Sequence, residues 1–238
     1  MRGHIPRASY FWVWSLTKAK MNQPHVLAEM ADAEKALATS GVADESLVVF
    51  HGDRRNTQLA TFGQWILDYL GKVESYVLDG GFESWLAASY PLEKGPVKHA
   101  TGDFKARPNE SLRATLSYVQ NRLGSAEMHL IDARTQEEYT GEAVVTPKPG
   151  RIPGSVHLPH EALLSDDGAF REPEHLRSLA GDAGVEGSRE VIVYCSTGER
   201  ATLVAFALRD ILGYPRVRVY PESFREWCSV PGLPIAMG

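Results

Sequence analysis

The part of this sequence best suited to chemistry is a cysteine that follows an apolar run. Residues 191–194 are β-branched or aromatic, Cys195 comes next, and Gly198 and Arg200 follow before a stretch of helical character. A loop between a buried strand and a helix can turn several backbone N–H groups inward, where they and the helix N-terminus favour negative charge. A thiol in that setting is expected to ionise readily, so Cys195 is predicted to be a nucleophile.

The residues that follow Cys195 support this interpretation. Gly198 permits a backbone conformation that a side chain would forbid, and Arg200 offers a forked pair of donors to loop carbonyls or to an anionic substrate. The alternative is an inert thiol buried at a strand end, which is common for free cysteines. Besides the cysteine, we expect the active-site loop to contain Ser196, Thr197, Gly198, Glu199, Arg200 and Ala201.

Alternating strands and helices must position this loop. Residues 47–50, 128–131 and 191–194 are short apolar runs, typical of parallel strands that are buried on both faces. Residues 201–212 follow a helical pattern, and Gly213 suits the C-terminus of that helix. The alternation predicts an α/β fold in which parallel sheets are flanked by helices.

The chain is an internal duplication. A glycine, a phenylalanine and a tryptophan recur at an offset of 142 positions without a gap, as Gly71 and Gly213, Phe82 and Phe224, and Trp85 and Trp227. Self-similarity of this kind indicates two copies of one domain. We predict an N-terminal domain over residues 1–93, a polar linker over 94–110 and a C-terminal domain over 111–238.

Only the C-terminal copy is predicted to be catalytic. The gapless offset places Asp53 opposite Cys195, and no cysteine precedes Cys195 in the chain. The second copy also has a predicted strand, residues 128–131, before its Gly-x-Ile-Pro motif, whereas the first copy begins almost at that motif, at Gly3. We expect the first domain to lack this opening strand, either through a truncated start or because it folds without one.

Composition argues against several functional classes. The 238 residues carry a formal charge of −5, which gives no electrostatic reason to expect nucleic acid or an anionic membrane as a partner. No apolar run approaches the ~20 residues that span a bilayer. The two cysteines, Cys195 and Cys228, lack the spacing of a metal or disulfide motif. No metal and no cofactor are therefore expected, and a reducing, cytoplasmic location is the expectation.

Several motifs are similar to those of a known family. In the second copy they are Asp132-Ala-Arg134, Gly150-Arg-Ile-Pro-Gly154, the loop from Cys195 to Arg200, and Phe224-x-x-Trp227. The first copy has Asp79-Gly-Gly-Phe82-x-x-Trp85. Together these motifs resemble the tandem rhodanese-like sulfurtransferases, the thiosulfate/3-mercaptopyruvate sulfurtransferase family, over essentially the whole chain. The resemblance implies two rhodanese-like domains, of which only the second carries the catalytic cysteine.

The resemblance also implies a reaction. In the family, the cysteine takes the outer sulfur of a donor as a persulfide, and a thiophilic acceptor then removes it, which predicts ping-pong kinetics. The expected donor is thiosulfate, with 3-mercaptopyruvate as the alternative, and the expected acceptor is cyanide or a cellular thiol. Arg134, Glu138 and Arg151 are candidate substrate contacts. Glu138 departs from tandem relatives that have an arginine there, and Glu199 also departs from their loops, so the donor stays open.

Two other functions remain as alternatives. Cdc25-like phosphatases and arsenate reductases close a similar loop with an arginine, but their loop is one residue longer than the four residues between Cys195 and Arg200. A rhodanese fold can also act as an inactive binding module. The presence of Cys195 favours an enzyme.

Overall fold

The computed structural model describes residues 3–20, 23–72 and 74–237. The first half contains η1 (Val13–Leu16), β1 (Thr17–Lys20), β2 (Gln23–Leu27), α1 (Met30–Thr39), β3 (Val48–Phe50), α2 (Thr57–Tyr69), β4 (Ser75–Val77) and α3 (Gly81–Ala87). The second half begins with η2 (Glu110–Leu112), α4 (Leu116–Arg122), β5 (Met128–Asp132), α5 (Gln136–Thr140), β6 (Val156–His157) and η3 (His160–Leu163). It continues with α6 (Pro173–Asp182), β7 (Glu190–Tyr194), α7 (Glu199–Phe206), a π turn η4 (Ala207–Ile211), β8 (Val217–Val219) and α8 (Ser223–Ser229).

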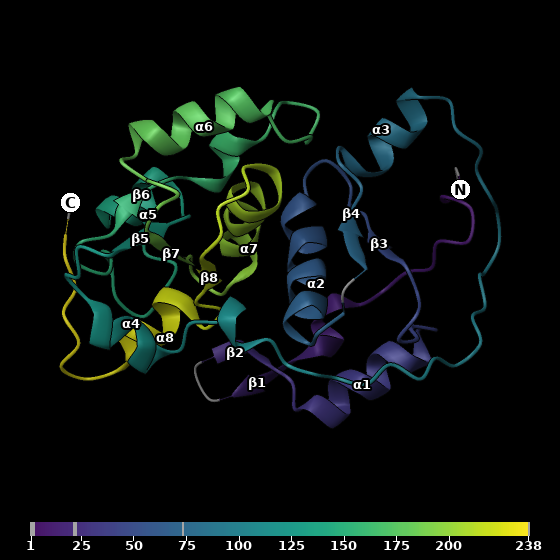
Figure 1. Cartoon of the computed structure of the whole chain (residues 1–238), viewed down its shortest axis with the longest axis horizontal. Coiled ribbons are helices and arrows are strands. Elements are labelled where there is room, and N and C mark those ends of the chain that lie inside the picture. Colours follow the sequence, from purple (N-terminus) through teal and green to yellow (C-terminus); the bar gives the residue numbers. More distant parts are fainter. Residues whose placement is uncertain (1–2, 21–22, 73, 238) are drawn as a thin grey trace.

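The second half is built on a parallel sheet of four strands in the order β6-β5-β7-β8. Its central pair joins Met128–Asp132 to Glu190–Tyr194 in parallel register over five residues. Residues 191–194 are all buried, as expected for an apolar run with helices on both faces of its sheet. Figure 1 shows helices on both sides of these strands. The predicted α/β class, with parallel sheets flanked by helices, is confirmed.

The first half has a smaller sheet. Strands β3 and β4 pair in parallel, and β1 and β2 form a separate antiparallel hairpin. In the second half β7 lies between β5 and β8, whereas within the described residues β3 pairs only with β4. The side chains of Leu47 and Val49 are 60% and 49% exposed. Within the described residues, the backbone of β3 is therefore paired along one edge only, and the side chains of Leu47 and Val49 are exposed beside it.

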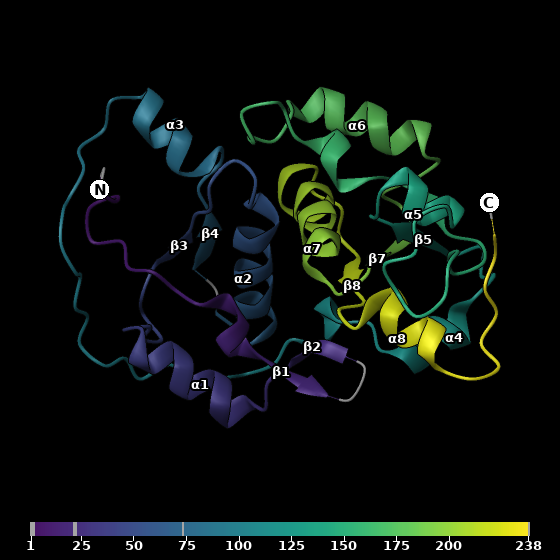
Figure 2. The ribbon, with the colours of Figure 1, turned by 180° about the vertical axis from the view of Figure 1, so that it is seen from behind.

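The two halves meet along two helices. Helices α2 and α7 lie side by side in both views of the molecule (Figures 1 and 2). The hydroxyls of Thr61 and Thr202 are 3.3 Å apart across this contact, and Arg209 Nη2 donates to Asp68 Oδ2 at 2.5 Å. One apolar core cluster contains buried residues of both halves. The turn from Cys195 to Gly198, which directly precedes α7, is therefore positioned near the first half.

The hydrogen-bond pattern corrects the register of the repeat. The N–H of Phe224 donates to the carbonyl of Cys195, and the N–H of Phe82 donates to the carbonyl of Gly52, both at 3.0 Å. Because Phe82 and Phe224 are equivalent in the repeat, Gly52 occupies the place of Cys195. The prediction that Asp53 stands there is wrong by one residue. The first half still has no cysteine at this place.

The error arises from a length change that a gapless offset does not reveal. Val48 pairs with Ser75 in the first half and Val191 pairs with Val217 in the second, so β3 and β7 correspond at an offset of 143 positions while β4 and β8 keep 142. Helix α2 (Thr57–Tyr69) and the continuous stretch of α7 and η4 (Glu199–Ile211) also begin and end 142 positions apart. The loop between strand and helix is therefore one residue longer in the first half, and the landmarks that follow it keep the offset of 142.

The segment predicted as a linker packs along the first half. Residues 94–109 contain no helix or strand, and Figure 1 shows them running along the outside of the first half before they enter the second. Phe104 is 2% exposed, and the N–H of Gly102 donates to the carbonyl of Ala38 at 2.8 Å. The linker is therefore anchored by a buried aromatic ring.

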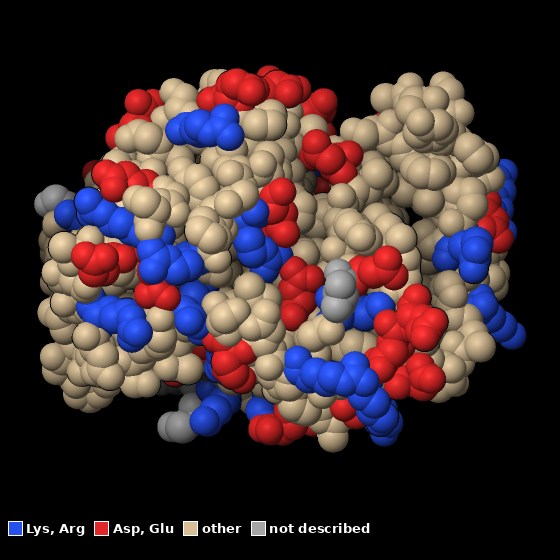
Figure 3. Space-filling view, in the orientation of Figure 1, with Lys and Arg blue, Asp and Glu red and all other residues tan. Residues whose placement is uncertain are grey.

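The surface and the helices agree with the charge and hydropathy of the sequence. On the face seen in Figure 3, Lys and Arg are interspersed with Asp and Glu. Among the described residues, no helix has both the length and the apolar character needed to cross a membrane. The described residues also contain no cluster of three His, Cys, Asp or Glu side chains placed to hold a metal ion.

Candidate active site

Cys195 lies at the carboxyl end of β7, where the chain turns toward α7. Its Sγ accepts a hydrogen bond from the N–H of Gly198 at 3.0 Å, and Ser223 Oγ lies 3.9 Å from the same sulfur. The side chain is 0% exposed. Backbone N–H donors and the positive end of a helix stabilise negative charge. The sulfur is therefore placed where a thiolate or a persulfide would be stabilised.

Gly198 is required by the shape of the loop. Its φ of +109° lies in a region that residues with a side chain rarely adopt. A Cβ at this position would lie 2.8 Å from the carbonyl oxygen of Pro221 and 3.5 Å from Cε2 of Phe62. The turn that directs the Gly198 N–H at the sulfur is thus available only to glycine.

The loop offers further donors. Within the described part of the chain, the N–H groups of Ser196, Thr197, Glu199 and Arg200 donate to no protein acceptor. The Thr197 hydroxyl donates to Glu199 Oε2 at 2.8 Å. Unpaired N–H groups beside the start of a helix form an anion-binding concavity. The residues predicted as the active-site loop are therefore brought together around Cys195.

Arg200 is bound by a carboxylate from a distant part of the chain. Its Nη1 and Nη2 donate to Glu138 Oε2 and Oε1 at 2.5 and 3.0 Å, and Nη2 also donates to Ser196 Oγ at 2.8 Å. Burial favours the neutral form of Glu138, but the hydrogen bonds and charge of Arg200, with help from Ser196 and the N–H of Thr135, lower the pKa of Glu138 to about 2. The positive charge of Arg200 is thereby compensated within the protein.

The side chain of Arg134 is buried and bound inside the second half. It is 1% exposed, its Nε and Nη2 donate to Asp132 Oδ1 and Oδ2 at 2.9 and 2.6 Å, and Nη2 also donates to the carbonyl of Gly150 at 2.8 Å. Its guanidinium lies over the ring of Phe224, 4.3 Å from the centroid. All of these contacts are internal, as is typical of a residue that stabilises the fold, and a contact between Arg134 and the substrate stays a prediction.

Arg151 is also engaged outside the loop. Its guanidinium lies 4.3 Å from the centroid of the Tyr139 ring, and Nη1 donates to the carbonyl of Tyr139 at 3.2 Å. Its backbone pairs with Ala236 near the C-terminus. None of these contacts joins Arg151 to Cys195 or its loop. Of the three candidate substrate contacts, only Glu138 touches the loop.

Ser223 is a neighbour of the sulfur that the sequence did not single out. Its φ is +58°, which is unusual for a residue other than glycine. Its hydroxyl accepts from the N–H of Cys195 at 3.0 Å and donates to the carbonyl of Tyr220 at 2.8 Å. Its position directly before the Phe224-x-x-Trp227 motif is the one sequence signal that could have pointed to it.

The first half contributes to the surroundings of the loop. Phe62 of α2 approaches Gly198, Trp14 lies 5.5 Å from Phe62 between ring centroids, and His25 stacks on Trp14 at 3.8 Å. The charge of Glu199 acts on His25. No sequence signal identified Phe62 or His25 as neighbours of the site, because they are brought there only by packing between the halves.

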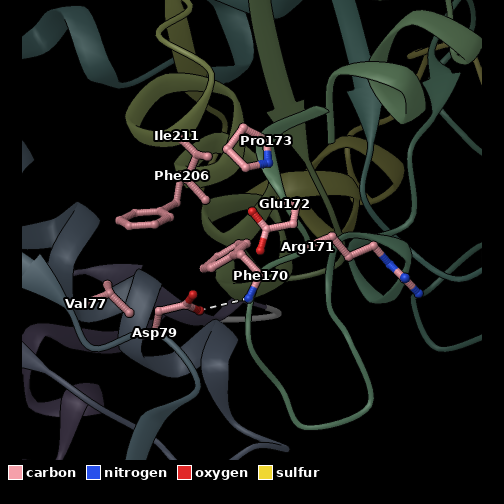
Figure 4. Close-up of a pocket in the computed structure, with 8 residues that line it drawn as sticks. All are labelled: Val77, Asp79, Phe170, Arg171, Glu172, Pro173, Phe206 and Ile211. Atoms are coloured by element: carbon pink, nitrogen blue, oxygen red, sulfur yellow. Dashed lines mark hydrogen bonds between the residues drawn. The ribbon is translucent and has the colours of Figure 1, made fainter. Parts of the chain in front are cut away.

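A separate cavity lies between the halves. It has a volume of about 330 Å³ and its lining comprises Val77, Asp79, Phe170, Arg171, Glu172, Pro173, Phe206 and Ile211, as Figure 4 shows. The Asp79 carboxylate accepts a hydrogen bond from the N–H of Phe170 at 2.8 Å. No residue of the loop 195–201 lines this cavity, so it is not the site around the thiol.

The site and both sheets match one known family. The family model described as "Rhodanese-like domain" matches residues 1–88 and 115–230. This chain belongs to the rhodanese-like family. The resemblance inferred from the sequence motifs is confirmed, and the two matched regions agree with the internal duplication.

Curated relatives of this rhodanese-like chain have related names. The "Putative thiosulfate sulfurtransferase" of Haloferax volcanii is 33% identical over 215 residues, which cover 87% of this chain and 74% of the relative. A Mycobacterium tuberculosis protein with the same name is 32% identical over 91% of this chain and 81% of its own length. A sulfur carrier protein of Thermus thermophilus is 30% identical over 86% of this chain and 75% of the relative.

Solved structures agree on the fold. The anaerobic ergothioneine biosynthesis enzyme of Chlorobium limicola, in complex with trimethyl histidine, aligns with a TM-score of 0.90 at 24% identity. A structure of the enzyme EanB with a cysteine persulfide and ergothioneine has a TM-score of 0.89 at 25% identity. Each alignment covers 99% of this rhodanese-like chain and 61% of the solved one. The chain thus spans about three fifths of the length of these proteins.

Proposed function

We propose that this rhodanese-like chain is a sulfurtransferase that moves the outer sulfur of thiosulfate to Cys195, and from there to a thiophilic acceptor such as cyanide or a thiol. The observation that carries the proposal is the position of the Cys195 sulfur, which ends a buried strand and accepts a hydrogen bond from the N–H of Gly198. The names of the curated relatives support the same reaction class.

The first step forms a persulfide. The Cys195 thiolate attacks the outer sulfur of thiosulfate, a new S–S bond forms, and the S–S bond of thiosulfate breaks, with its electron pair leaving on sulfite. Negative charge is then carried by the terminal persulfide sulfur. The N–H groups of Gly198 and of the loop residues that lack protein acceptors are suited to stabilise that charge.

The second step regenerates the enzyme. The acceptor attacks the terminal sulfur, the Cys195 S–S bond breaks, and its electron pair returns to Cys195 as the thiolate. Cyanide would leave as thiocyanate, and a thiol would leave as a persulfide. Because the first half has no cysteine, it acts by enclosing the loop through α2 and the residues before it.

The pairing of Arg200 with Glu138 bears on the alternative functions, a phosphatase or an arsenate reductase. A phosphatase or an arsenate reductase needs its loop arginine to bind the oxyanion, whereas Arg200 is already bound by Glu138 in a two-point pair. This pairing disfavours the phosphatase alternative. 3-Mercaptopyruvate remains the alternative donor, because its sulfur is attacked by the same thiolate. A cytoplasmic location stays a prediction.

The proposal is tested by following sulfur on the protein. The intact chain is incubated with thiosulfate or with 3-mercaptopyruvate, and its mass is measured after removal of the donor. The parent and a Cys228→Ser control are expected to gain one sulfur atom from thiosulfate, while Cys195→Ser gains none. If the parent gains no sulfur from either donor, or if Cys195→Ser gains it as readily, the proposed function is wrong.

A further inference from the structure

The arginines around the catalytic loop are mostly neutralised by carboxylates. Arg200 is paired with Glu138, and Arg134 with Asp132. Arg113 Nη2 contacts Glu222 Oε1 at 2.6 Å, which compensates its charge, although its buried Nε has no hydrogen-bond partner among the described residues. A guanidinium that is bound at two points by a carboxylate has little attraction left for a further anion. Arg200, Arg134 and Arg113 are therefore poorly suited to bind the anionic part of a donor.

Arg225 differs from these arginines. Its own N–H donates to the carbonyl of Ser196 at 3.2 Å, which fixes the first turn of α8 against the catalytic loop. Ser223, two residues earlier, contacts the Cys195 sulfur. The backbone of Arg225 is therefore held next to the loop, independently of the conformation of its side chain.

The guanidinium of Arg225 is only partly satisfied. Its Nη2 donates to the carbonyl of Val145 at 2.8 Å. Its Nε is buried and has no hydrogen-bond partner, and among the described residues no carboxylate lies within salt-bridge distance of it. Arginine has five N–H donors, and a buried donor without an acceptor is unfavourable by about 1–3 kcal/mol. An added oxyanion would supply the acceptor and the missing countercharge.

The groups that face Arg225 place it at the boundary between the halves. Burial lowers the pKa of His25, the carboxylate of Glu199 opposes that shift, and the positive charge of Arg225 adds to it. His25 belongs to β2 of the first half, and Glu199 is the first residue of α7, directly after the loop that carries Cys195. Glu222 and Glu226 on the same helix are engaged by Arg113 and by the Tyr220 hydroxyl.

We propose that Arg225 binds the anionic end of the sulfur donor, the sulfonate of thiosulfate or the carboxylate of an α-keto thiol, and so determines the preference for anionic donors. This inference rests on the proposed function, and it assigns donor recognition to α8 in place of Arg134, Arg151 or the paired Arg200. The forked N–H donors of a guanidinium can bind two oxygens of a carboxylate, or two of the three oxygens in the tetrahedral sulfonate group of thiosulfate.

The test measures anion recognition in two independent ways. Arg225→Gln and Arg225→Lys are compared with Arg189→Gln, which removes an exposed arginine paired with Glu186. The first measurement is the thiosulfate concentration that gives half-maximal sulfur loading of Cys195. The second is the rate of Cys195 alkylation by anionic iodoacetate relative to neutral iodoacetamide, in Cys228→Ser background, which needs no sulfur transfer.

We expect Arg225→Gln to raise the half-maximal thiosulfate concentration by about tenfold or more, equivalent to about 1.4 kcal/mol. It should also lower the iodoacetate-to-iodoacetamide ratio, with an intermediate effect for Arg225→Lys and none for Arg189→Gln.

Unchanged values of both quantities in Arg225→Gln would overturn the inference. If Arg225→Gln fails to fold, an Arg225→Lys variant with parental values overturns it instead. If the parent loads no sulfur, the proposed function fails, while the alkylation ratio still decides the role of Arg225.

Discussion

The carboxylate of Glu138 forms a two-point pair with the guanidinium of Arg200, although the two residues are 62 positions apart. Glu138 is at the third position of the short helix α5, where it also completes a capping box with Thr135. One side chain thus caps the start of α5, accepts a hydrogen bond from the Ser196 hydroxyl and compensates the charge of Arg200 near Cys195. Because this pair compensates the charge of Arg200, the site offers less positive charge to an anion than a loop with an unpaired arginine would.

Removing the charge of Glu138 should change donor binding. In Glu138→Gln the amide can still accept hydrogen bonds, but Arg200 becomes an uncompensated cation beside the loop. We expect a several-fold lower thiosulfate concentration for half-maximal loading of Cys195, measured by intact mass. The matched control is Glu137→Gln, which removes the exposed neighbouring carboxylate. A folded Glu138→Gln protein with weaker thiosulfate loading would show that the pair serves only to position Arg200.

The same pair should make the protein sensitive to acid. The pKa of Glu138 is about 2 in the folded chain, against 4.5 for a free glutamate. A depressed pKa stabilises the fold above the unfolded value, and that stability is lost as pH falls from about 4.5 toward 2. The contribution amounts to about 3 kcal/mol. Urea unfolding across this range should show a smaller acid-induced loss in Glu138→Gln than in the parent. Parallel losses in both proteins would contradict this role.

A side chain at Gly198 should disable the loop. In Gly198→Ala the new Cβ would lie 2.8 Å from the carbonyl oxygen of Pro221, at a φ of +109°. The backbone must shift, and the N–H that reaches the sulfur moves with it. We expect a loss of stability of about 1–3 kcal/mol and little or no sulfur loading. The control is Gly181→Ala in α6, where nothing lies within 4 Å of the added Cβ, and where stability should rise by about 0.5–1 kcal/mol. Normal loading by Gly198→Ala would exclude the proposed geometry.

Arg134 should contribute to the stability of the folded chain and not to binding of the sulfur donor. Replacing it with methionine leaves Asp132, which is 0% exposed, as an unpaired buried carboxylate. Loss of one partner of a buried pair costs about 3–5 kcal/mol. The double variant Asp132→Asn with Arg134→Met should recover part of that stability in thermal unfolding. If Arg134→Met keeps its stability but requires far more thiosulfate for loading, Arg134 contacts the donor after all.

The sequence alone predicted a nucleophilic cysteine in the loop and determined the duplication of the chain. Cys195, Gly198 and Arg200 lie within six consecutive residues, between a buried strand and a helix whose patterns are local. Local patterns and repeated motifs are visible in a linear chain because neighbours in sequence remain neighbours in space. For the same reason the α/β class and the missing nucleophile of the first half could be predicted.

Only the tertiary structure decided which groups surround that loop. Glu138 reaches Arg200 from a different helix, Arg225 meets the loop through α8, and His25 approaches from the first half. The equivalence of Gly52 with Cys195 also required the hydrogen-bond register, because the loop is one residue longer in the first half and the repeated landmarks all follow that loop. Such contacts depend on how helices and strands pack. Packing brings together residues that are far apart in the sequence and share no local sequence pattern.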